Sequence, residues 1–263
     1  MRCDRCDRDA ILLQRYSGLR LCGEHLISGL ESRAKGTIRA HGWIRPGDRI
    51  AVALSGGPAS VSLLHFLVTH FGMRRDLSFI AITVDEGGWT DLGRTRAIAE
   101  GMGIEWAAAS PHREIRGDRV PGQTEAPFGG TGLRDDALAS LARDGGATKL
   151  ALGTSLDSMA RSVFLKVLDG DGAGLTRGSG EGEGGIPRIE PFIRIPAGEL
   201  ALYAMLNSLD HVSGRGMDAR DSLEAEAGRL LDDFAARHPS APFSLANLGE
   251  ALSGGTGGGR THG

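Results

Sequence analysis

Cysteine and lysine are both scarce in this chain. Its three cysteines all lie within the first 22 residues, and its three lysines leave arginine to supply nearly all of the positive charge. The net charge of −3 argues against a generally basic nucleic-acid binder. No apolar run approaches the roughly 18 residues that span a membrane, and no signal peptide is recognisable at the start. We therefore expect a cytoplasmic protein that makes no membrane contact.

The composition is otherwise that of an ordinary globular protein. A chain of 263 residues, 40% hydrophobic and 24% charged, can bury a sizeable core in one or two domains. Positive charge is concentrated in one stretch, which also contains His41. Its basic residues are Arg33, Lys35, Arg39, Arg45 and Arg49. Such a cluster predicts either a contact with a phosphate backbone or a solvated helix face.

The three cysteines and one histidine have the spacing of a metal site. Cys3 and Cys6 form one pair, and after fifteen residues Cys22 and His25 form a second pair. Two such pairs predict a closed, tetrahedral and structural zinc site, which folds a segment too short for a core of its own. A chance spacing is the alternative, and a disulfide does not suit a cytosolic chain.

A second local signal lies at residues 50–71. The aliphatic run Ile50–Leu54 predicts a buried parallel strand, Ser55-Gly56-Gly57 ends it, and Pro58–Phe71 has helical spacing of apolar residues. Glycines allow close approach of the backbone to an anion, and the amides of a new helix face it. We therefore predict an anion-binding loop. A structural tight turn is the alternative.

The chain after this loop alternates strands and helices at lengths typical of right-handed βαβ units. The pattern predicts an α/β fold with a doubly wound parallel sheet. Asp85 follows the second strand, at the edge where such sheets bind ligands. We expect a last strand over Ile189–Ile195 and a glycine-rich loop over residues 169–185. We divide the chain into a zinc-finger segment (1–32), the α/β domain (33–210), a C-terminal helical extension (211–252) and a disordered tail (253–263).

Taken together, the finger, Ser55-Gly56-Gly57-x-x-Ser60, Val84-Asp85-Glu86-Gly87 and the stretch 146–157 (GATKLALGTSLD) form one ordered set. This set resembles the tRNA 2-thiouridine and 2-thiocytidine thiolation family of the PP-loop ATP pyrophosphatases. The resemblance covers roughly residues 1 to 250. It implies ATP-dependent adenylation of a tRNA base followed by sulfur transfer, with ATP and Mg²⁺ bound at the carboxyl edge of the sheet. It also implies tRNA as a partner, a sulfur-carrier protein and a homodimer.

The resemblance assigns roles residue by residue. A catalytic role falls on Asp157, and the nucleotide-binding positions are Ser55, Gly56, Gly57, Ser60, Asp85 and Gly153. Several family positions differ. Pro58 and Ala59 replace the Lys and Asp of the loop SGGKDS, and the stretch 153–158 retains one of the two carboxylates of GHNLDD. The Cys-x-x-Cys pair falls on Phe128 and Thr131.

These differences have chemical consequences. Because no cysteine follows Cys22, we expect no iron–sulfur cluster. We expect adenylation to be impaired, since a lost charged hydrogen bond costs on the order of 1.5–3 kcal/mol. Two alternatives remain: a catalytically inactive paralogue that binds tRNA, a nucleotide or an active partner subunit, and a zinc-finger nucleotide-binding regulator.

Overall fold

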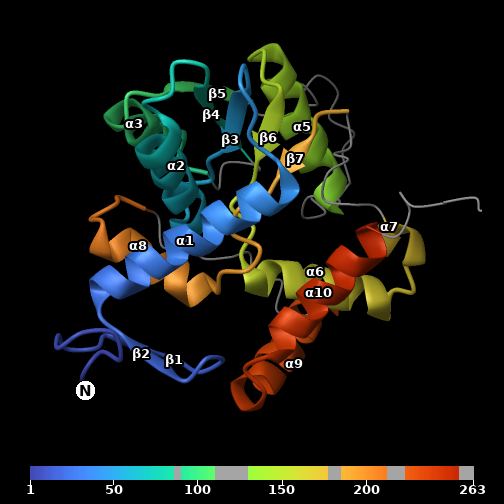
Figure 1. Cartoon of the computed structure of the whole chain (residues 1–263). Helices are drawn as coiled ribbons and strands as arrows, with labels where there is room; N and C mark the ends of the chain where they lie inside the picture. Colours follow the sequence, from blue (N-terminus) through green and yellow to red (C-terminus); the bar gives the residue numbers. More distant parts are fainter. Residues whose placement is uncertain (86–89, 110–129, 177–184, 212–222, 255–263) are drawn as a thin grey trace, which may run out of the picture.

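The computed structural model describes residues 1–85, 90–109, 130–176, 185–211 and 223–254. Its centre is a five-stranded, entirely parallel sheet with the strand order β5-β4-β3-β6-β7. The strands are β3 (Arg49–Ala53), β4 (Ser78–Val84), β5 (Glu105–Ala109), β6 (Lys149–Ala151) and β7 (Arg188–Ile189). Figure 1 shows helices on both faces of this sheet, as predicted for a doubly wound α/β fold.

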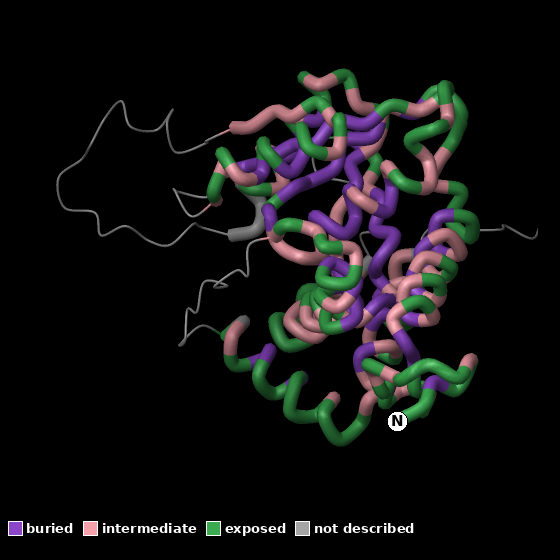
Figure 2. Tube along the Cα trace, turned by 90° about the vertical axis from the view of Figure 1, so that its left-hand side faces the viewer, coloured by how far each residue is buried: buried purple, intermediate pink, exposed green. Residues whose placement is uncertain are grey.

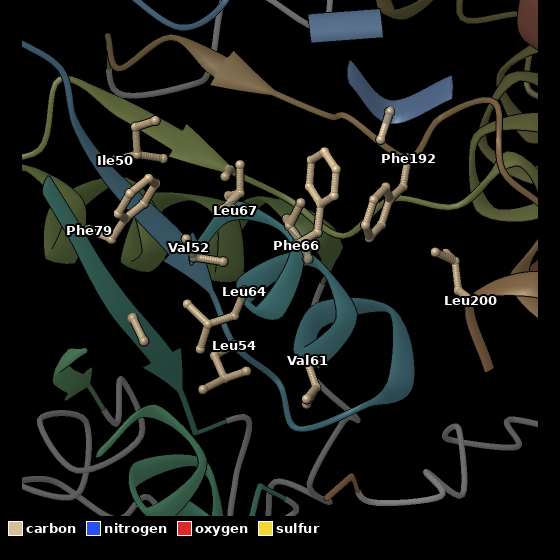
Figure 3. Packing of buried hydrophobic residues seen from close by; sticks show 14 of the residues in the cluster. Ile50, Val52, Leu54, Val61, Leu64, Phe66, Leu67, Phe79, Phe192 and Leu200 are labelled. Atoms are coloured by element: carbon tan, nitrogen blue, oxygen red, sulfur yellow. The ribbon is translucent and has the colours of Figure 1, made fainter. Parts of the chain in front are cut away.

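The two faces of the sheet are covered by different helices. One face packs against α1 (Gly23–His41), α2 (Pro58–Phe71), α3 (Leu92–Gly101) and α8 (Ala197–Leu206). The other face packs against α5 (Gly130–Asp144). Alternate residues of β3 serve the two faces: Ile50 and Val52 point toward α2, whereas Ala51 contributes to the α5 side. The close-up in Figure 3 shows the side chains of β3 and α2 packed together.

Beside the sheet, four helices form a separate layer. They are α6 (Leu156–Leu168), α7 (Gly172–Thr176), α9 (Leu223–Arg237) and α10 (Ala241–Gly254). They pack on one another at one end of the molecule in Figure 1. At another end, the hairpin of β1 (Leu12–Gln14) and β2 (Leu19–Leu21) leads into α1. Figure 2 shows that buried residues are concentrated along the strands and along the helix faces that meet them.

Two expectations about the chain after β6 are wrong in detail. The last strand ends at Ile189 rather than at Ile195, because Pro191 has no amide hydrogen to continue a ladder and residues 191–194 form a turn. Phe192 and Ile195 are buried in the core all the same, which is why the run resembled a strand. In the glycine-rich stretch, α7 forms at Gly172–Thr176, while residues 177–184 lie outside the described part.

The proposed division into segments is not decided by these elements. Helix α1 runs continuously across the expected boundary at residue 32, and the tail beyond residue 254 lies outside the described residues. The division therefore stays a prediction. None of the described helices is both long enough and apolar enough to cross a membrane.

Candidate functional site

The predicted anion loop joins the carboxyl end of β3 to the first turn of α2. Gly56 has a φ of 83°, a conformation that glycine adopts without strain, and Gly57 is the N-cap residue of α2. The Ser55 and Ser60 hydroxyl oxygens lie 3.1 Å apart, and the Ser60 hydroxyl donates to the Gly57 carbonyl at 3.0 Å. The first-turn amides of a helix have no intrahelical partner. The loop therefore presents backbone donors at the sheet edge.

A second turn approaches this loop closely. Gly153 follows β6, and a Cβ atom on it would lie 3.0 Å from the carbonyl carbon and oxygen of Ala59 and from the amide nitrogen of Ser60. Only glycine fits this contact without displacing backbone. Because β4 and β6 lie on opposite sides of β3, the two turns meet where the sheet order reverses, which is where open α/β sheets bind ligands.

The two predicted carboxylates lie at the same edge but have different surroundings. Asp85 directly follows β4, and its amide donates to the Ala109 carbonyl at 2.8 Å. Asp157 lies in the first turn of α6, and its Oδ2 accepts the Ala197 amide at 2.5 Å. This bond satisfies a free amide at the start of α8. Asp157 therefore has a structural contact, and its catalytic role stays a prediction.

A cavity of about 190 Å³ opens beside the loop. Its lining residues come from the end of β3 and the loop after it, from β4, from the segment before α3 and from α5: Ala53, Leu54, Ser55, Ile82, Val84, Thr90, Arg134 and Leu138. Pockets that enclose whole drug-sized ligands usually measure roughly 300–1,000 Å³. As lined by the described residues, the cavity suits one ring system rather than an entire nucleotide.

A buried carboxyl that was not predicted from the sequence lies at this edge. Glu190 directly follows β7, is 8% exposed, and accepts a hydrogen bond of 2.7 Å from the Thr154 hydroxyl. Burial raises the pKa of Glu190, although the Thr154 hydroxyl opposes that shift. The misplaced last strand hid this residue, because it put Glu190 inside the strand. A rule that examines the residue after each parallel strand would have found it.

The two positions of the family's Cys-x-x-Cys pair cannot both be placed in the described structure. Phe128 is not among the described residues, and the side chain of Thr131 is not described either. Asp135, farther along α5, forms an ion pair with Arg188 on β7, in which Oδ2 of Asp135 lies 2.9 Å from Nη1 of Arg188. This position therefore ties α5 to the edge of the sheet.

The four predicted zinc ligands come together at the N-terminus. The ligand atoms of Cys3, Cys6, Cys22 and His25 all lie within 4.8 Å of one another. Cys6 Sγ lies 3.7 Å from Cys22 Sγ, and His25 Nδ1 lies 3.6 Å from Cys3 Sγ. A tetrahedral zinc ion with ordinary bond lengths requires edges of about 3.8 Å between sulfurs and about 3.6 Å between sulfur and nitrogen. The donor set therefore fits a structural zinc ion.

Backbone amides also prepare the Cys3 thiol for metal binding. Burial raises the pKa of Cys3, but backbone amides of Arg5 and Cys22 outweigh it and lower the pKa to about 6. The Arg5 amide donates to Cys3 Sγ at 3.4 Å. Zinc binds the thiolate form. Among the described residues, no other group of three or more such ligands gathers, so a magnesium ion would rely on one or two carboxylates such as Asp85 together with phosphates.

The finger is attached to the α/β domain through a buried carboxylate. Glu199 on α8 is 4% exposed and accepts hydrogen bonds from Gln14 Nε2 at 3.0 Å and from the Tyr16 hydroxyl at 2.6 Å. Arg33 on α1 forms an ion pair with the same carboxylate. Burial raises the pKa of Tyr16, so its hydroxyl stays protonated and donates. Arg33, one member of the basic cluster, is therefore occupied within the protein.

Comparison with known proteins places these features in one family. Residues 2–27 match the family model of the N-terminal LIM domain of 2-thiouridine synthetase TtuA. The cytoplasmic tRNA 2-thiolation protein 1 of Bos taurus is 31% identical over 95% of this chain and 78% of its own length. The tRNA 2-thiolation protein NcsA of Haloferax volcanii is 28% identical over 93% of this chain and 84% of its own length.

One solved structure shares the fold over nearly the whole chain. The U34-tRNA thiolase NcsA from Methanococcus maripaludis superposes with a TM-score of 0.83 at 24% identity, covering 97% of this chain and 87% of that one. It is described with its [4Fe-4S] cluster, so the expectation of no iron–sulfur cluster is wrong. That expectation counted only thiolates from a single chain, whereas cluster irons also accept imidazole ligands. The three cysteines of this chain all belong to the N-terminal site.

The N-terminal finger and the overall fold agree with these comparisons. The relative from Bos taurus exceeds 30% identity over most of both chains. The chain belongs to the tRNA 2-thiolation protein family of the PP-loop superfamily.

Proposed function

We propose that this protein adenylates a carbonyl oxygen of a tRNA base with ATP and that sulfur then replaces the oxygen, at a rate reduced by the changes in its loop. The observation that carries the proposal is the backbone geometry from Ser55 to Ser60, with Gly56 in the left-handed region and Gly153 packed against the first turn of α2. This geometry supplies amide donors for the pyrophosphate portion of ATP without any side chain.

The chemistry proceeds in two steps. The carbonyl oxygen of the base attacks the α-phosphorus of ATP, the bond to the β-phosphate oxygen breaks, and pyrophosphate leaves with its electron pair. Sulfur from a persulfide or a thiocarboxylated carrier protein then attacks the base carbon, and AMP departs with the original oxygen. The sulfur is released onto the base when its bond to the donor breaks: water hydrolyses the acyl–sulfur bond of a thiocarboxylate donor and leaves a carboxylate on the carrier, whereas a second thiol attacks the inner sulfur of a persulfide donor and forms a disulfide with it. The loop amides would hold the pyrophosphate oxygens in the first step. Asp85 is our candidate for the carboxylate that helps to hold a magnesium ion against the phosphates.

Pro58 is the main reason for the reduced rate. It has neither an amide hydrogen nor a cation at the first position of α2. The loss of one charged hydrogen bond costs on the order of 1.5–3 kcal/mol, which corresponds to roughly a 10- to 150-fold loss. The other residues of the loop from Ser55 to Ser60 are uncharged, so none of them replaces the lysine of the family's loop.

A catalytically inactive paralogue is the second candidate. The contact between Asp157 and the Ala197 amide favours it, because that carboxylate oxygen is already occupied. Such a protein would bind tRNA, a nucleotide or an active partner subunit without adenylating a base. A zinc-finger nucleotide-binding regulator is the third candidate, and tRNA binding separates it from the other two.

The decisive experiment is ATP–pyrophosphate exchange with zinc-loaded protein, with and without tRNA. We expect slow exchange that depends on tRNA and that becomes faster in the variant Pro58→Lys/Ala59→Asp. Calorimetric titration with ATP reports binding separately from the reaction. Absence of exchange in both proteins at saturating tRNA and magnesium, despite ATP binding, would leave the inactive paralogue as the better description.

The partners and the location belong to the same proposal. We infer a cytoplasmic location, which the name of the bovine relative supports. The second step requires a sulfur donor, for which we propose a sulfur-carrier protein, and we propose a homodimer on the family resemblance. Light scattering during gel filtration tests the dimer, and pull-down with the thiocarboxylated carrier tests the sulfur donor.

A further inference from the structure

Positive charge accumulates at the amino edge of the sheet, opposite the candidate nucleotide site. Between residues 31 and 77 there are three carboxylates, and each has a cationic or imidazole partner. These pairs are Glu31 with His70, Asp48 with Lys149, and Asp76 with Arg74. In the same stretch Lys35, Arg39, Arg45 and Arg75 form no ion pair within the described part of the chain.

Two of these cations border a groove. Its volume is about 290 Å³, and it lies between the last turns of α1 and α2. Lys35 and Arg39 line it together with the His70 imidazole, over an apolar floor of Ile38 and Phe71. The groove therefore combines two unpaired cations with a surface that excludes part of the surrounding water. That combination suits an anion with an attached organic part.

The groove is remote from the candidate ATP site. Helix α2 begins at the Ser55–Ser60 loop and ends at Phe71, beside the groove. A helix of 14 residues is about 21 Å long. One nucleotide bound at the loop cannot reach this groove, whereas a polynucleotide can contact both edges of the sheet at once.

An aromatic pair lies where α1 ends and the connection to β3 begins. The rings of His41 and Trp43 are stacked with their centroids 4.4 Å apart and their planes 13° apart. His41 is exposed, and Trp43 is partly buried against the core. An exposed flat ring near unpaired cations is the arrangement on which unpaired nucleic-acid bases stack. This favours RNA over a free phosphate ion as the ligand of this edge.

We propose that the groove lined by Lys35 and Arg39 binds backbone phosphates of RNA. The identification of that RNA as tRNA rests on the proposed function. Arg45 and Arg75 extend the same charged edge through the loops on either side of β3 and α2. The tRNA would thus be held at the amino edge while one of its bases lies at the carboxyl edge.

The test measures tRNA affinity by filter retention between 50 and 200 mM salt. For Lys35→Ala/Arg39→Ala, we expect an affinity about tenfold or more below that of the wild type near 0.1 M salt, and a slope of log K against log salt smaller by about two. The charge-conserving variant Lys35→Arg/Arg39→Lys should bind like the wild type. Arg237→Ala, which removes an exposed cation from α9, is the matched control and should change little.

The outcomes separate this inference from the proposed function. Wild-type affinity and slope in the double-alanine variant, with zinc content and circular dichroism unchanged, would overturn the groove assignment and leave tRNA thiolation standing. Failure of the wild-type protein to bind tRNA at 50 mM salt would overturn both. Calorimetric titration with inorganic phosphate identifies the source of the ligand. If the double-alanine variant no longer gives a binding heat with phosphate but binds tRNA as tightly as the wild type, the groove binds free phosphate and not RNA.

Discussion

Replacing Gly153 by alanine tests the contact that joins the two turns of the candidate site. The added Cβ would lie 3.0 Å from three backbone atoms of Ala59 and Ser60. Backbone atoms cannot rotate away as a flexible side chain can, so either the turn after β6 or the first turn of α2 must move. Overpacking of this kind costs about 1–3 kcal/mol of unfolding free energy. For a chain of this size, each kcal/mol lowers the melting temperature by about 2–4 °C.

The assay is thermal unfolding followed by circular dichroism, together with ATP titration by calorimetry. We expect Gly153→Ala to melt roughly 2–12 °C below the wild type and to bind ATP more weakly, because the displaced atoms belong to the loop. The matched control is Gly29→Ala in α1, where an added Cβ meets no atom within 4 Å. That variant should gain about 0.5–1 kcal/mol from helix propensity. A Gly153→Ala protein as stable as the wild type would refute the close packing.

Three further predictions concern the anchoring of the finger and the buried carboxyl. Removal of zinc by a chelator should lower the melting temperature of the whole protein and change its near-UV circular dichroism, because the finger supplies the Tyr16 donor to Glu199. Arg33→Met should cost about 3–5 kcal/mol in denaturant unfolding, since Glu199 keeps its buried charge without its cation; a double variant that also carries Glu199→Met should recover most of this loss. Burial raises the pKa of Glu190, so the native state binds its proton more tightly and stability falls as pH rises above the ordinary value of 4.5. Glu190→Gln keeps an acceptor for Thr154, and its melting temperature relative to the wild type should rise between pH 4.5 and pH 8; a pH-independent difference would contradict the raised pKa.

The features that sequence predicted correctly are those fixed by local spacing. Two pairs of ligands with two intervening residues each predicted a zinc site, and the ligand atoms of Cys3 and His25 do lie 3.6 Å apart. The strand, the two glycines and the helix beginning at Pro58 also formed as predicted. In both cases the signal lies in short spacings: each ligand pair spans four residues, and the strand, loop and helix follow one another directly.

The features that sequence missed depend on long-range packing. A turn places the apolar side chains of Phe192 and Ile195 in the core. Because a buried strand has the same apolar composition, the sequence alone does not distinguish this turn from a strand. Gln14 and Glu199 are 185 residues apart and share a hydrogen bond. No periodicity in the chain marks such a pair, because its partners come from elements that meet only after the sheet has formed.

The basic cluster illustrates how folding divides a uniform sequence feature. Five cations within residues 33–49 predicted either one phosphate contact or one solvated face. In the structure, Arg33 pairs with Glu199 and Arg49 pairs with Glu105 at 2.6 Å. The remaining cations lie near the amino edge, where Arg75 from another part of the chain joins them. Two cations of the cluster therefore form ion pairs within the protein, whereas the other three are left to contact a ligand.

Backbone and side-chain contributions to the ATP site are separable in this protein. In the proposed site, the amides after Gly56 would contact phosphate oxygens irrespective of the side chains at positions 58 and 59, with the one exception that Pro58 has no amide hydrogen. A lysine at that position acts chiefly on charge that grows as pyrophosphate leaves, so its absence lowers the rate more than the affinity. ATP affinity should therefore change less than the exchange rate when Pro58→Lys is introduced. Equal changes in both quantities would mean that the cation acts in binding, and that the backbone cradle alone is not sufficient to hold the nucleotide.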